Sequence, residues 1–256
     1  MTAPADHLLA VRDVALAFGG VVALADVSLH IRPCELVGLI GPNGSGKTSL
    51  CNVISGLYRP SAGSVRLNGE ELVGRRPHEV ARLGVARTFQ GVETFGMSVM
   101  DNVLLGRHVH WRSGVAGVLA RSRTERAERR AQFAAAAAAL DALELTRHRA
   151  APASDLPYGT RKRVELSRAV AMEPKLLILD EPTAGMNPTD KAEIATLIRR
   201  LNRDSGLAVL LVEHDLGFVR NLVSRLVVLN FGRVLAAGAT DEVLDDESVV
   251  DAYVRG

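Results

Sequence analysis

With 256 residues, the chain is long enough for one large α/β domain or for one domain with an insertion, and its 47% hydrophobic content is sufficient for a sizeable core. A formal net charge of +2 is too small to predict nucleic acid or an anionic membrane as the direct partner. The two cysteines lack metal-ligand spacing, which indicates a reducing, intracellular compartment. We find neither a signal-peptide pattern nor an apolar run of the roughly 20 residues that a membrane span needs, so we expect any membrane role to depend on a partner.

Short apolar segments recur along the chain, and several of them precede helical patterns. These segments span residues 8–14, 27–31, 36–40, 64–67, 176–179, 208–212 and 226–229. After Asp190, a stripe of Ile194, Leu197, Ile198 and Leu201 keeps helical spacing. Because strands that alternate with such helices form a parallel sheet covered on both faces, we predict an α/β core with a mostly parallel sheet.

Two regions depart from this alternation. The Asn68-Gly69 pair after a strand-like run is typical of a hairpin turn, so we expect an antiparallel β element near the N-terminus. Residues 91–160 contain few strand-like runs and include a charged, Ala-rich stretch. The residues with helical spacing in that stretch are Phe133, Ala137, Leu140 and Leu143. We predict a core formed by residues 1–90 and 161–256, with an inserted helical subdomain at 91–160.

A glycine-rich loop follows the apolar segment 36–40 and precedes a helical pattern. The loop matches G-x-x-x-x-G-K-[ST] and consists of Gly41, Pro42, Asn43, Gly44, Ser45, Gly46, Lys47 and Thr48. Its glycines allow backbone N–H groups to point at phosphate oxygens, and the helix N-terminus adds a favourable dipole. Lys47 supplies positive charge to the β- and γ-phosphates, and the Thr48 hydroxyl is a hard oxygen ligand for Mg²⁺. The sequence therefore predicts a site for ATP and Mg²⁺.

Two acidic residues, Asp180 and Glu181, end the apolar segment 176–179. A strand that emerges beside the phosphate loop would place Asp180 near the Mg²⁺ coordination sphere. Glu181 points elsewhere and is suited to polarise an attacking water. An acidic turn after a strand is common, so this pair predicts ATP hydrolysis only in combination with the upstream loop.

The order of motifs resembles the nucleotide-binding domain of ABC transporters over essentially the whole chain. Besides the loop and the acidic pair, the resemblance rests on Arg87-Thr88-Phe89-Gln90, residues 156–165, residues 182–188 and Glu213-His214-Asp215. The details are most similar to the ATPases of branched-chain amino-acid importers. The features that favour this branch are Phe18-Gly19-Gly20, the extended helical region, the Tyr158-Gly159 pair and the segment 251–256. The implied fold is a P-loop NTPase core with an N-terminal antiparallel β element and an inserted helical subdomain.

The resemblance also implies roles for four further residues. Phe18 falls where an aromatic ring stacks on adenine, and His214 falls where an imidazole contacts the γ-phosphate. Gln90 falls where an amide reaches Mg²⁺ and the lytic water. Gly159 belongs to the signature segment, which in this family faces the ATP held on the opposite subunit.

The signature segment departs from the family's usual Leu-Ser-Gly-Gly-Gln. The same positions hold Leu156, Pro157, Tyr158, Gly159 and Thr160. Pro157 offers neither a hydroxyl nor an N–H, a loss of roughly 1.5–3 kcal/mol for a charge-assisted bond to phosphate. Because the Gly159 N–H and the basic start of the following helix remain, we interpret the segment as modified and not as inactive. Asn187 stands where the family often has Asp.

The function implied by the resemblance is ATP hydrolysis that drives solute import at the cytoplasmic face of the membrane. The implied partners are a second ABC ATPase subunit (a related chain or an identical copy), two membrane permeases and, indirectly, a solute-binding protein. Residues 91–106 are the expected permease contact. One alternative is an ATPase for lipid or lipopolysaccharide export. Another is a soluble ABC ATPase acting on nucleic acid or ribosomes, although the chain has no tandem ATPase units and no basic stripe.

Overall fold

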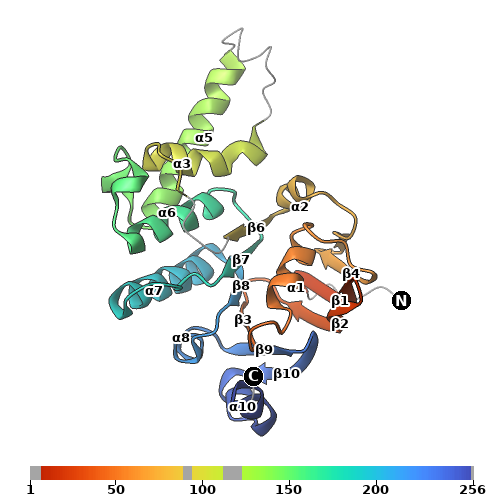
Figure 1. The fold of residues 1–256 in the computed structure, drawn as a ribbon. Helices are drawn as coiled ribbons and strands as arrows, with labels where there is room; N and C mark the ends of the chain where they lie inside the picture. Colours follow the sequence, from red (N-terminus) through yellow and green to blue (C-terminus); the bar gives the residue numbers. More distant parts are fainter. Residues whose placement is uncertain (1–6, 89–93, 112–122, 255–256) are drawn as a thin grey trace.

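The computed structural model describes residues 7–88, 94–111 and 123–254, and its main layer is a six-stranded sheet (Figure 1). In spatial order the sheet contains β10 (Arg233–Ala239), β9 (Arg225–Asn230), β3 (Leu36–Ile40), β8 (Ala208–Val212), β7 (Leu176–Asp180) and β6 (Val85–Thr88). All neighbours are parallel except β10, which runs antiparallel to β9. The predicted mostly parallel sheet is confirmed. The two outer strands β6 and β10 were not expected, because one is short and the other is rich in Ala and Gly.

A second, antiparallel sheet forms the N-terminal layer, as expected. It contains β2 (Val21–Ile31), β1 (Leu9–Phe18), β4 (Ala62–Leu67) and β5 (Glu70–Glu71). Asn68 (φ 49°) and Gly69 (φ 80°) form the turn between Leu67 and Glu70, where two positive φ angles match the twist of a tight hairpin. β1 extends to Phe18, whereas the apolar segment in the sequence ended at Val14. Register shifts on either side of Val14 interrupt the alternation of buried and exposed residues, so the sequence pattern did not indicate the rest of the strand.

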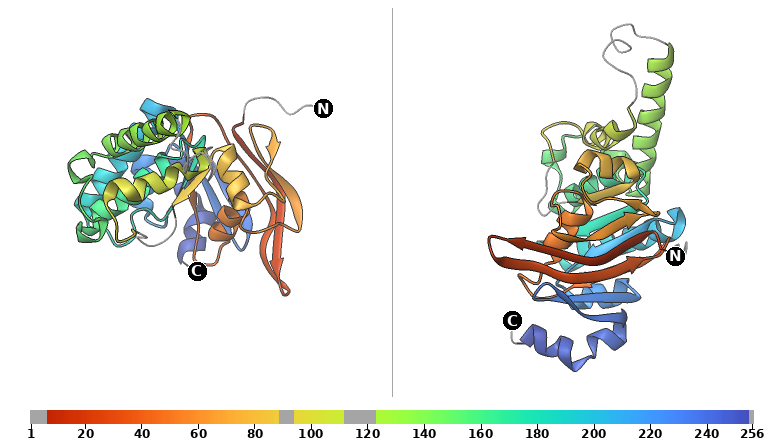
Figure 2. Two further views of the ribbon diagram at one scale, coloured as in Figure 1. Left: turned by 90° about the horizontal axis from the view of Figure 1, so that it is seen from above. Right: turned by 90° about the vertical axis from the view of Figure 1, so that its right-hand side faces the viewer.

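The six-stranded sheet separates two hydrophobic clusters, since successive side chains of a strand point to opposite faces. Val37 and Leu39 join the cluster that β3 shares with the antiparallel sheet and with α1 (Lys47–Ile54). Leu36 and Ile40 join the cluster on the other face, together with α7 (Pro188–Ser205) and α8 (Leu216–Leu222). Seen from above, the antiparallel sheet lies on one side of the main sheet, and a group of helices described next lies on the other side (Figure 2).

The helical part is built from α3 (Val99–Gly106), α5 (Arg123–Ala142) and α6 (Tyr158–Val170), which pack against one another. Helix α6 spans the boundary that we placed at residue 160. The other helices in the described parts of the chain are α2 (Pro77–Leu83), α9 (Thr240–Leu244) and α10 (Glu247–Val254), with short 3₁₀ turns at Arg107–His110, Thr146–His148 and Ala153–Asp155. Among the described residues, no helix is both long and apolar enough to cross a bilayer.

Two helical stripes can be compared with the sequence patterns. In α7 the residues Ile194, Leu197, Ile198 and Leu201 are buried, as predicted. In α5 the helix is confirmed, and Leu140 and, just beyond its last residue, Leu143 are buried as predicted. The other buried apolar residues of the stripe are Ala136 and Ala139, whereas Ala137 is exposed. Phe133 is exposed and lies under the guanidinium of Arg129, so small alanines, and not the large aromatic ring, face the neighbouring helices.

Candidate nucleotide site

The phosphate loop connects β3 to α1, and two of its glycines have no room for a side chain. A Cβ atom on Gly41 (φ 150°) would lie 2.1 Å from the carbonyl oxygen of Leu229. A Cβ atom on Gly46 (φ 105°) would lie 2.7 Å from the carbonyl oxygen of Ala23. The loop can therefore pack tightly between β2 and β9 while it keeps backbone angles that other residues rarely adopt.

Backbone hydrogen bonds fasten this loop to the turn between β9 and β10. The Gly232 N–H donates to the Ser45 carbonyl at 2.9 Å, and the Ala25 N–H donates to the Gly232 carbonyl at 2.8 Å. One glycine thus joins the loop to strand β2 of the antiparallel sheet. The loop is therefore held by both layers.

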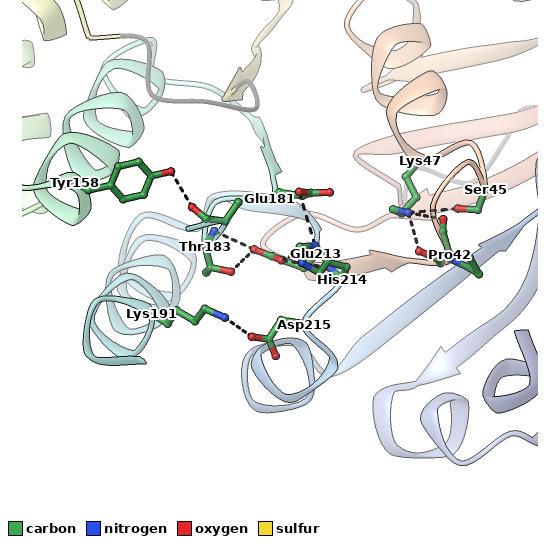
Figure 3. Close-up of polar contacts among 12 residues, drawn as sticks. Pro42, Ser45, Lys47, Tyr158, Glu181, Thr183, Lys191, Glu213, His214 and Asp215 are labelled. Atoms are coloured by element: carbon green, nitrogen blue, oxygen red, sulfur yellow. Dashed lines mark hydrogen bonds and ion pairs between the residues drawn. The ribbon is translucent and has the colours of Figure 1, made fainter. Parts of the chain in front are cut away.

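Lys47 lies inside the loop and is largely buried (7% exposed). Its ammonium donates to the carbonyl oxygens of Gly41 at 2.7 Å and Pro42 at 2.9 Å (Figure 3). Burial lowers the pKa of Lys47, while the nearby carboxylates of Glu181 and Asp180 oppose that shift. The charge needed for phosphate binding is therefore held at the centre of the loop, opposite the two acidic residues.

Asp180 ends β7 in a buried ion pair. Its Oδ2 accepts a hydrogen bond at 2.6 Å from Arg87 at the end of β6, and both side chains are nearly inaccessible (5% and 2% exposed). Arg87 also donates to Asn52 of α1 at 2.6 Å. Arg87 thereby links β6, β7 and α1. This role could not be predicted from sequence patterns, because the partners of Arg87 are distant in the chain.

The donors available for Mg²⁺ are of the right chemical type. Thr48 is exposed at the start of α1, next to Lys47, and Asp180 contributes a carboxylate. Mg²⁺ is commonly bound through one or two such oxygen ligands, with phosphate and water oxygens completing its shell. The third expected ligand, Gln90, lies outside the described residues.

Glu181 leaves the strand in an unusual backbone conformation, with φ at 47°. Its N–H donates to the Val212 carbonyl at 2.9 Å, which holds the turn against the end of β8. The carboxylate is partly accessible (22% exposed), and its Oε2 lies 3.7 Å from Nδ1 of His214. Figure 3 shows Glu181 and His214 beside each other and Lys47 across from them, so three of the predicted site residues come together. A carboxylate in this place can accept a proton from water.

Glu213, the residue before His214, anchors the loop that follows Glu181. Its side chain is fully buried, and Oε1 accepts hydrogen bonds from the N–H of Thr183 at 3.0 Å and from the Thr183 hydroxyl at 2.6 Å. This satisfied buried carboxylate fixes the loop to the end of β8. The sequence placed Glu213 in a motif but did not indicate this anchoring role.

Two residues with predicted nucleotide contacts remain, Phe18 and Gly159. Phe18 is half exposed (48%) beside the turn between β1 and β2, with Tyr58 edge-on at 5.2 Å between ring centroids. Gly159 is buried in the first turn of α6, where an added Cβ would lie 2.5 Å from Oδ2 of Asp190. Tyr158 lies on the far side of Glu181 from Lys47 (Figure 3), so the signature segment stands apart from this chain's own phosphate loop.

Comparisons with known proteins agree with this geometry. A family model described as "ABC transporter" matches residues 24–184. The high-affinity branched-chain amino acid transport ATP-binding protein LivG of Salmonella typhimurium is 38% identical, over 96% of this chain and 97% of LivG. The lipopolysaccharide export system ATP-binding protein LptB of Acidithiobacillus ferridurans is 37% identical, over 91% of this chain and 90% of LptB. A solved ABC transporter cassette in its ADP conformation has a TM-score of 0.84 and 29% identity, with 98% of this chain and 99% of that chain covered.

Proposed function

The chain belongs to the ABC transporter family, and on that premise we propose that it is the ATP-hydrolysing subunit of an importer for branched-chain or related amino acids. The expected family resemblance and fold class are both confirmed by the comparisons. Similarity to LivG over nearly the whole length supports the importer branch. The single observation that carries hydrolysis is the position of Glu181, held at a sharp turn beside His214 and facing the ammonium of Lys47.

In the proposed reaction, the loop N–H groups and Lys47 bind the phosphates of ATP. Thr48, Asp180 and Gln90 would hold Mg²⁺, which would supply positive charge that offsets the charge of the phosphates. Glu181 orients a water molecule and accepts its proton, and His214 contacts the γ-phosphate. Phe18 stacks on adenine through its exposed ring face.

The proposed assembly contains a second ATPase subunit and two membrane permeases, with a solute-binding protein as an indirect partner. Gly159 in the first turn of α6 faces the nucleotide on the other ATPase subunit. The helical part, assigned to residues 91–160, contacts the permease through the segment 91–106. Large side chains exposed along this segment support that contact, namely Phe95 (47%), Met97 (38%) and Leu105 (40%). The chain then works at the cytoplasmic face of the membrane.

A second candidate function is ATP hydrolysis for lipopolysaccharide export, which the identity to LptB favours. The two functions differ in the proteins that accompany the chain. Co-purification with permeases and a solute-binding protein is expected for the importer. Stimulation of hydrolysis by the amino acid bound to that solute-binding protein would exclude the export function.

The test of hydrolysis is Glu181→Gln, which keeps the size of the side chain and removes its basicity. We expect the rate of Mg-ATP hydrolysis to fall by roughly 10²–10⁴-fold, because general-base catalysis is lost. The affinity for ATP, measured by equilibrium dialysis, should stay the same. The matched control Glu242→Gln changes an exposed carboxylate in α9 and should leave the rate unchanged. Parent-like hydrolysis by Glu181→Gln would contradict the proposed mechanism.

A further inference from the structure

A tyrosine in the signature segment makes direct contact with the loop that follows Glu181. The Tyr158 hydroxyl, in the first turn of α6, donates a hydrogen bond to the carbonyl oxygen of Ala184 at 2.8 Å (Figure 3). Ala184 lies only a few residues after Glu181 and belongs to the segment that leads into α7. The contact therefore connects the helical part of the molecule with the loop of the hydrolytic carboxylate.

The fit between this tyrosine and the loop is close. Gly185, next to Ala184, has a φ of 75°, and a Cβ atom there would lie 3.3 Å from the Tyr158 hydroxyl oxygen. On α6, the guanidinium of Arg161 lies 5.8 Å from the centroid of the Tyr158 ring. The ring is thus seated between its own helix and a glycine that leaves space for it.

The contact continues through one residue, Ala184, to Glu181. The N–H of Ala184 donates to the Glu181 carbonyl at 3.2 Å, while the carbonyl of Ala184 accepts from Tyr158. On the opposite side, Thr183 is fixed to the buried carboxylate of Glu213. The loop therefore has one anchor in the core and one in the helical part, and Glu181 precedes both anchors in a left-handed conformation (φ 47°).

The first turns of α6 and α7 also leave little room to slide past each other. Gly159 lies against the carboxylate of Asp190, where even a Cβ atom would be only 2.5 Å away. Farther along, Arg163 of α6 forms an ion pair with Glu193 of α7. A displacement of the α6 N-terminus is therefore transmitted to the start of α7 and to the loop before it, and is not absorbed by a gap.

We propose that Tyr158 is a positioning residue that sets the place of Glu181 according to the position of the first turn of α6. This inference rests on the proposed function, in which that turn faces the nucleotide of the second subunit. The hydroxyl contact then makes hydrolysis at this chain's phosphate loop depend on occupancy of the other site. Tyr158 stands where the usual signature has its first glycine. Its hydroxyl makes a contact that glycine at that position cannot make.

The test is Tyr158→Phe, which removes only the hydroxyl and keeps the ring over Gly185. We expect kcat for Mg-ATP hydrolysis to fall about 2- to 10-fold, the effect of one hydrogen bond, with the half-saturating ATP concentration and the melting temperature unchanged. The dependence of the rate on ATP concentration should be cooperative in the parent and close to hyperbolic in the variant. Ser154→Ala is the matched control, since it deletes an exposed hydroxyl that donates a hydrogen bond to the adjacent Asp155.

Three outcomes would overturn the inference: a parent-like kcat, a hyperbolic parent, or a loss of rate that merely follows a lower melting temperature. Failure of this inference is distinct from failure of the proposed function. If Glu181→Gln abolishes hydrolysis while Tyr158→Phe behaves as the parent, the ATPase proposal stands and only the role of Tyr158 is lost. If Glu181→Gln hydrolyses ATP normally, the proposed function itself fails.

Discussion

At the scale of single residues, the pairing of Asp180 with Arg87 explains how a carboxylate can be kept buried and charged at the end of β7. The guanidinium supplies a hydrogen bond at 2.6 Å and is itself fixed by Asn52. Removal of one partner of such a pair leaves an uncompensated charge in a place that water scarcely reaches. Arg87 therefore stabilises the fold in addition to holding a metal ligand in place.

We expect Arg87→Gln to lower the free energy of unfolding by about 3–5 kcal/mol, because Asp180 loses its buried counter-charge. Urea denaturation followed by circular dichroism measures this change. The control is Arg203→Gln, whose ion pair with Asp204 is highly exposed and should leave the unfolding midpoint where it is. Equal midpoints for Arg87→Gln and the parent would show that the buried pair does not stabilise the fold.

At the scale of elements, the N-terminus of α7 explains why asparagine stands at position 187. The Asn187 Oδ1 accepts from the Asp190 N–H at 2.9 Å, which caps the helix, and Nδ2 donates to Asp190 Oδ2 at 3.0 Å. An aspartate could provide the first bond but would set a second carboxylate against Asp190. The departure from the family pattern is therefore matched to the residue three positions later.

We expect Asn187→Asp to destabilise the protein by about 1 kcal/mol near neutral pH, because an amide donor is replaced by a like charge. The repulsion acts only while both carboxyls are ionised. The penalty is therefore largest when that carboxyl is ionised and disappears as the pH falls below the unfolded pKa. Urea unfolding at about pH 8 and about pH 4 measures the difference. The control is Asn187→Ser, which keeps a capping oxygen without charge, so its stability relative to the parent should not vary with pH. A penalty in Asn187→Asp that does not depend on pH would contradict the explanation.

Local patterns were sufficient to predict the phosphate loop, the acidic pair and the stripe of α7, because each depends on neighbours in the sequence. The face that α5 buries was not predictable, since Phe133 would favour one face and close packing of alanines selects another. The contacts of Arg87, Glu213 and Tyr158 were also missed. Each joins segments that meet only after the sheet has formed, so no spacing rule indicates them.

At the scale of the whole molecule, helix α1 is enclosed between the two sheets. Cys51 of this helix is completely buried in the cluster that both sheets share, and burial raises the pKa of its thiol to about 12. Cys34, by contrast, is exposed. The thiol of Cys51 therefore becomes reactive only when the layers separate, and it reports on opening around the phosphate loop.

We expect a thiol reagent to label Cys34 rapidly in the folded protein and Cys51 only slowly. In a Cys34→Ser variant, Mg-ATP should slow the labelling of Cys51 by up to about 100-fold at a concentration 100 times its Kd, because the nucleotide stabilises only the closed form. Mass spectrometry of timed samples measures both rates. Labelling of Cys51 at the rate of Cys34, or at a rate that nucleotide leaves unaltered, would contradict this assignment. Cys34 in the parent serves as the internal control.

The central place of β3 in its sheet has a consequence for co-translational folding. Leu36 pairs with Val209 and Val37 pairs with Arg225, so the strand that carries the phosphate loop is flanked by partners made far later. During translation, the loop leaves the ribosome long before β8 and β9 exist, and both edges of β3 stay open to unwanted pairing. A nascent chain should therefore bind nucleotide only after Asn230, the last residue of β9, has left the exit tunnel. We expect the need for chaperones to be greatest between the emergence of β3 and the emergence of β9.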